Sequence, residues 1–184
     1  MFPILMVLLM GIIEFSLAFN AVIGINRAST DAVLVASEEG NAPGADCLIL
    51  NQVETDVLAP NNTANIVSVQ IQRTGPSGGS IYAFNAYDRT GSTTCTFSDG
   101  TTMTVPYTAT TTGYPESQRC NVSSGCASMT PPRTTVDTVG VQVRYRYAWR
   151  TPLASLLTLV GGNDPNGPTW TFQKRNVSRM EPIL

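Results

Sequence analysis

The chain has 184 residues, of which 13% are charged, with a formal net charge of −2 and no histidine. This length suits one compact domain plus an anchor, and the few basic residues do not form the clusters that bind nucleic acids. Without histidine, a Ser-His-Asp triad, a Cys-His nucleophile and a histidine-ligated zinc site are all excluded.

The first predicted element is a long apolar helix. Residues 1–25 carry one charge, Glu14, and the first basic residue is Arg27. About 24 helical residues rise roughly 36 Å, which is enough for a hydrocarbon core of about 30 Å. A buried core helix is disfavoured because the segment is apolar on all sides, and a cleaved signal because the run is long and has no basic start. We therefore predict a membrane-spanning helix.

The helix is predicted to continue past the membrane. Ala28, Ala32 and Ala36 provide a small apolar face over the next turns, and Gly40 follows as a typical C-terminal cap. The expected helix covers about residues 3–39. Its first half would face lipid or sister helices, and its second half would pack on the domain that follows.

Glu14 is an ionisable residue inside the apolar run. Such a group is costly in a membrane, so it is a functional candidate. One interpretation is a polar contact with the helix of a neighbouring subunit. The other is a protonated side chain bonded to a backbone carbonyl, or a side chain hydrated at the membrane edge, and the two interpretations stand about even.

Four cysteines, Cys47, Cys95, Cys120 and Cys126, lie outside the apolar segment, and none has C-x-x-C spacing. In an exported domain this number predicts two disulfides, with three possible pairings. The turn-forming residues 121–125 favour a Cys120–Cys126 bridge, which leaves Cys47–Cys95. We expect this second bridge to tie the end of the long helix to the domain. The cysteines also indicate that the C-terminal domain lies outside the cytoplasm.

The first part of the domain reads as a helix followed by a hairpin. Apolar spacing over residues 46–57 predicts a short amphipathic helix. Alternation over residues 66–73 and a second apolar run at 81–87 predict two strands, joined by the Gly-rich turn 75–79. Residues 88–135 are polar and Thr-rich, and we interpret them as a long excursion tied by disulfides.

The strongest strand pattern covers residues 139–149, where apolar and polar side chains alternate. A short apolar helix at 153–160 and a last strand at 169–179 follow. We predict an α+β fold, a long helix packed on an antiparallel sheet of about four strands. Residues 1–40 would form the helix and residues 41–184 the exported β-rich domain.

Several motifs resemble one family. The sequence Met-Gly-Ile-Ile-Glu-Phe at 10–15, followed by Phe19, is similar to the apolar core of TadE-like proteins, the pilin-like subunits of tight-adherence (Tad) pilus systems. The C-terminal half is also similar, at residues 139–147, 151–153 and 179–182. The resemblance covers both ends of the chain but not its Thr-rich middle.

The resemblance implies a structural pilin-like subunit, a minor pilin or pseudopilin, and not an enzyme, with no catalytic residue, cofactor or metal. It implies a single-pass protein of the inner membrane, with its domain outside, that reaches the cell surface when a pilus incorporates it. The implied partners are other pilin subunits, the pilus assembly machinery, prepilin peptidase and the membrane. A basic leader with its cleavage site is expected upstream of Met1. The residues expected to mediate helix assembly are Gly11, Glu14, Phe15, Ala18, Phe19 and Gly24.

An alternative function is a membrane-tethered binding module or a carboxylate-dependent enzyme. Asp88, Asp99, Glu116 and Asp137 could supply a pair of carboxylates. None of the four lies in a recognisable motif, and scattered acidic residues in loops are usually solvated surface.

Overall fold

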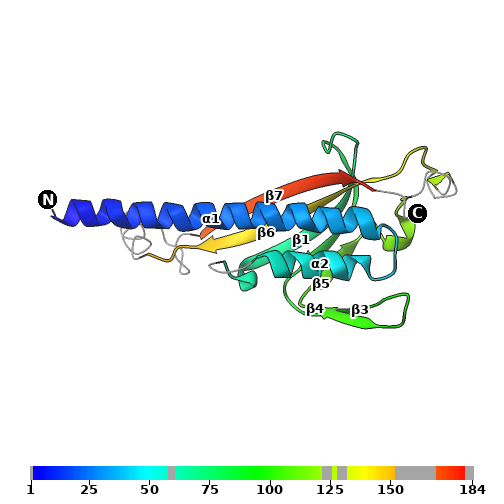
Figure 1. Cartoon of the computed structure of the whole chain (residues 1–184), viewed down its shortest axis with the longest axis horizontal. Helices are drawn as coiled ribbons and strands as arrows, with labels where there is room; N and C mark the ends of the chain where they lie inside the picture. The colour runs from blue at the N-terminus through cyan, green and yellow to red at the C-terminus, as the bar shows by residue number, and fades with distance from the viewer. Residues whose placement is uncertain (1, 58–60, 122–125, 128–131, 152–168, 181–184) are drawn as a thin grey trace.

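The computed structural model describes residues 2–57, 61–121, 126–127, 132–151 and 169–180. These residues form helices, a large sheet and a small separate hairpin (Figure 1). In chain order the elements are α1 (Phe2–Glu39), α2 (Ala45–Asp56), β1 (Ile66–Thr74), β2 (Ile81–Asp88), β3 (Thr93–Thr96), β4 (Thr102–Val105), β5 (Thr108–Thr112), β6 (Thr138–Ala148) and β7 (Thr169–Arg179).

Helix α1 confirms the long helix predicted from the sequence. It ends at Glu39, and the following Gly40 has a φ of 54°, in the left-handed region that glycine adopts without strain. One face of α1 is buried, and its residues recur every three or four positions, as a helical face requires. They are mostly alanines, which allow the sheet to approach closely: Ala18, Ala21, Ile25, Ala28, Ala32 and Ala36.

The large sheet has the strand order β5-β2-β1-β6-β7, with antiparallel neighbours throughout. The alternation predicted for β6 is confirmed, because its odd-numbered residues from Val139 to Tyr147 are all buried. Ser29 joins α1 to this sheet. Its hydroxyl donates to the carbonyl of Val141 at 2.7 Å and accepts from the amide of Asn176 at 3.2 Å.

The middle of the chain is more regular than we expected. Residues 88–135 contain β3, β4 and β5, and β5 makes the large sheet five-stranded instead of four-stranded. The side chains of Thr108–Thr112 are all exposed along β5. This edge strand therefore has no buried face, and its sequence lacks the alternation that marks a half-buried strand. The helix expected at 153–160 lies outside the described residues.

Both disulfides join the pairs that the sequence favours, Cys47 to Cys95 and Cys120 to Cys126. Cys47 lies in the first turn of α2 and Cys95 in β3. This bridge therefore fixes the β3–β4 hairpin to α2, whereas we expected it to tie the end of the long helix to the domain.

Candidate assembly site

The N-terminal part of α1 projects beyond the strands of the sheet (Figure 1). Within the described part of the chain, α1 is the one helix that is long and apolar enough to cross a membrane, judged by length and composition. Its large apolar side chains are strongly exposed. They are Ile4, Leu5, Leu8, Leu9, Ile12, Phe15, Phe19 and Ile23.

The six residues expected to mediate helix assembly divide between two sides of α1. Phe15 and Phe19 face outward, each 67% exposed, whereas Glu14 and Ala18 are buried against the chain's own domain. At Gly24 an added Cβ atom would lie 2.6 Å from the side chain of Asn61, so this glycine admits a loop of the same chain. At Gly11 an added Cβ atom would meet nothing within 4 Å. The assembly role of these residues stays a prediction, and the outward side is the one open to a partner.

Glu14 has an environment that neither of our interpretations anticipated. It is only 2% exposed, and its carboxylate accepts from the Tyr147 hydroxyl at 2.6 Å. It also accepts from the backbone amide of Arg150 at 3.1 Å and from that of Thr151 at 2.8 Å. The partners belong to the same chain because β6 runs antiparallel to β1 along α1 and ends beside helix position 14.

The donor Tyr147 is well suited to this contact. Its burial, and next its hydrogen bond to Glu14, raise the pKa of the phenol above its ordinary value. The hydroxyl group therefore keeps its proton and remains a donor at neutral pH. The interaction connects the projecting helix to the end of the sheet, 133 residues further along the sequence.

Aromatic rings surround the Glu14 contact. Trp170 of β7 lies 6.3 Å from Phe15 of α1 and 5.0 Å from Trp149, measured between ring centroids. Phe172 continues the cluster to Tyr147. Tryptophan and tyrosine are enriched where membranes meet water. We did not predict this cluster from the sequence, although both tryptophans of the chain flank the segment 150–169.

Three of the four acidic residues considered for an enzyme make contacts within the fold. Glu116 accepts from the backbone amides of Gly44 at 3.0 Å and Asp46 at 2.8 Å, and so caps the N-terminus of α2. Asp137 accepts from the hydroxyl of Tyr114 and the amide of Cys120, and Asp99 accepts from Thr101. These contacts favour structural roles for three of the four carboxylates.

A buried polar network holds α2 against the middle of the chain. The carboxylate of Asp46 pairs with Arg119, which is fully buried, and also accepts from Tyr87. Asn85 donates to the same carboxylate at 2.8 Å. A buried charge needs such partners to offset its loss of hydration. No local sequence signal indicates this network, since it joins three separate segments.

Together these features define a class: an α+β protein in which an apolar helix carries a small, disulfide-bonded antiparallel sheet domain. Residues 1–34 match the family described as TadE-like protein, the family that the sequence motifs resemble. The match covers most of α1 and none of the sheet domain. No curated protein and no solved structure matches the chain.

Proposed function

We propose that the chain is a minor pilin-like subunit of a Tad-type pilus that assembles with other subunits through α1. The observation that carries this proposal is the exposed apolar surface of α1. Fully burying one such side chain is worth about 1.5–3 kcal/mol relative to water. A surface that repeats such side chains along the projecting helix needs lipid or protein to cover it.

Before assembly, the proposed cover is lipid. Residues 1–40 form the helix, whose first half anchors the protein in the inner membrane as a single span and whose second half packs on the domain, and residues 41–184 lie outside the cytoplasm. The two disulfides support this orientation, because disulfides persist in oxidising compartments. Prepilin peptidase and the pilus assembly machinery are the proposed partners at this stage.

After assembly, the proposed cover is the α1 helices of other subunits, and the domain is exposed at the cell surface. Replacing lipid contacts by contacts with other helices gives no gain in hydrophobic burial. The association of the helices therefore has to be stabilised by close van der Waals packing. Gly11 is suited to that contact because its Cα has open space beside it. Phe15 and Phe19 lie on the outward side and would fill the spaces between helices.

Single cysteines on α1 test the proposal. The four native cysteines are paired, so a Phe19→Cys variant carries one free thiol. We expect a photo-crosslinker attached to this thiol to link the chain to other pilus subunits, both in native membranes and in sheared filaments. The matched control is Ser98→Cys in the exposed loop between β3 and β4, which should not cross-link.

Electron microscopy and mass spectrometry of the sheared filaments complete the test. A minor subunit should be present in the filaments at a small fraction of the main component. If the filaments lack the chain and Phe19→Cys stays monomeric, the filament role is wrong, and an assembly factor or a tethered domain replaces it.

A further inference from the structure

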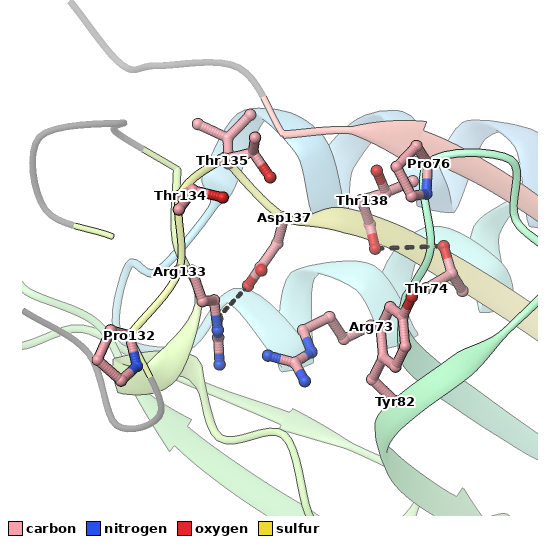
Figure 2. A pocket seen from close by; sticks show the side chains of 11 residues that line it. Arg73, Thr74, Pro76, Tyr82, Pro132, Arg133, Thr134, Thr135, Asp137 and Thr138 are labelled. Carbon is pink, nitrogen blue, oxygen red and sulfur yellow. Dashed lines mark hydrogen bonds and ion pairs between the residues drawn. The ribbon is translucent and has the colours of Figure 1, made fainter. Parts of the chain in front are cut away.

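A hollow opens at the end of the sheet domain that lies away from the Glu14 contact (Figure 2). Its volume is about 360 Å³. We call this hollow the arginine groove. Its lining residues come from the ends of β1 and β2 and from the segment that leads into β6. They are Arg73, Thr74, Tyr82, Arg133, Asp137 and Thr138.

Two guanidinium groups in this groove have unused donors. Figure 2 shows the side chains of Arg73 and Arg133 extending toward one another. The Nε atom of each is shielded from water, and neither has an acceptor among the described residues. A ligand in the groove cannot reach these shielded Nε atoms, but it can reach the outer nitrogen atoms of the half-buried Arg73. Those nitrogen atoms have no acceptor among the described residues, so a ligand can supply one.

The charges of the groove indicate what that ligand carries. Asp137 pairs with Arg133, which also donates to the carbonyl of Gln118 at 2.7 Å. Arg73 has no carboxylate partner in the described part of the chain, and its guanidinium lies 5.3 Å from the centre of the Tyr82 ring. The groove therefore has one uncompensated positive charge, which suits one negative charge on the ligand.

The geometry of the guanidinium donors indicates which kind of anion the groove binds. The planar fork of a guanidinium matches the two oxygens of a carboxylate. The rest of the lining is rich in hydroxyl groups, with Thr134 and Thr135 beside Thr74 and Thr138. Tyr82 is 60% exposed and offers an aromatic surface. Such a lining fits a ligand that combines one carboxylate with several hydroxyl groups.

We propose that the arginine groove binds an acidic sugar through its carboxylate, with Arg73 as the main contact. A neighbouring hollow of about 350 Å³ shares the wall formed by Pro76, Thr135 and Thr138 and continues toward Arg179. The site therefore has room for more than one sugar unit. It lies on the domain, away from the helix surface that we assign to assembly, and the two proposals are independent.

Calorimetry of the full-length protein in detergent tests the site, with D-glucuronate as the probe and D-glucose as its neutral match. We expect glucuronate to bind at least tenfold more tightly than glucose. Arg73→Gln should weaken glucuronate binding at least tenfold, and Arg73→Lys should weaken it less, because lysine keeps the charge but not the fork. Arg146→Gln is the matched control, since Arg146 is exposed on β6 away from the groove.

Four results would overturn the proposal. Equal binding of glucose would mean that the carboxylate is not recognised. Unchanged glucuronate binding in Arg73→Gln, or an equal loss in Arg146→Gln, would remove the specific role of Arg73. Binding of N-acetyl-aspartate at least as tight as that of glucuronate would assign the groove to an acidic peptide. Circular dichroism of each variant establishes that the fold is retained.

Discussion

At the scale of the residue, Glu14 has the clearest role in the structure. An acidic group in an apolar helix is expected to contact another subunit or to be neutralised. Here the carboxylate accepts hydrogen bonds from three donors of its own chain, the hydroxyl of Tyr147 and the backbone amides of Arg150 and Thr151. Glu14 thereby holds the end of β6 against the helix, at the level where α1 leaves the sheet.

Replacing Glu14 by glutamine tests this role. The side-chain volume is retained, but the amide group cannot accept from all three donors, and a buried donor is left without an acceptor. We expect Glu14→Gln to lower the free energy of unfolding by about 1–3 kcal/mol. Thermal unfolding in detergent, followed by tryptophan fluorescence, measures the change directly, because Trp149 and Trp170 lie in this cluster.

The control for Glu14→Gln is Tyr147→Phe. It removes one donor and leaves both amides paired with the carboxylate, so its cost should be smaller, about 0.5–1.5 kcal/mol. If Glu14→Gln unfolds at the wild-type temperature, the contact with β6 does not hold the helix to the sheet.

At the scale of the element, the ends of β6 and β7 carry the aromatic cluster beside the projecting part of α1. If α1 is a membrane anchor, this cluster lies close to the bilayer surface, where tryptophan is favoured. The two tryptophans of the chain both belong to it, so intrinsic fluorescence reports on this position alone.

Depth-dependent quenching in lipid vesicles tests the position of the cluster. We expect lipids brominated near the headgroup to quench the fluorescence more strongly than lipids brominated near the chain ends. The variants Trp149→Phe and Trp170→Phe each retain one tryptophan, so the depth of each position can be measured separately. Fluorescence that no brominated lipid quenches would show that the sheet domain stands clear of the membrane.

At the scale of the whole molecule, buried tyrosines make stability depend on pH. Burial is the largest cause that raises the pKa of Tyr87, Tyr107 and Tyr114, and the carboxylates beside them add to it. In the unfolded chain these phenols ionise at about pH 10. Above that pH the native state holds more protons than the unfolded state, so the free energy of unfolding decreases as pH rises.

The measurement is denaturant unfolding at several pH values, together with absorbance of the ionised phenol. Below about pH 9 these tyrosines should contribute no pH dependence, and above about pH 10 stability should fall steadily. A Tyr87→Phe variant, which lacks one of the shifted groups, should lose stability less steeply. Titration of all six tyrosines together near pH 10 in the folded protein would contradict the expectation.

The elements with a strong local pattern were predictable from the sequence. The apolar run and Gly40 define α1, and the alternation from Val139 to Tyr147 defines β6. The short separation of Cys120 and Cys126 along the sequence favoured their bridge. In each case the signal lies within a few neighbouring residues, which is the range over which helix and strand periodicity and loop closure act.

Only the tertiary structure decided which distant residues meet. It pairs Glu14 with Tyr147, buries Arg119 against Asp46, and brings Arg73 and Arg133 into one groove. It also adds β5 to the sheet through backbone hydrogen bonds, which leave no hydrophobic pattern in the sequence. These contacts depend on the strand order and on the packing of α1 against the sheet, and a local pattern of residues encodes neither of them.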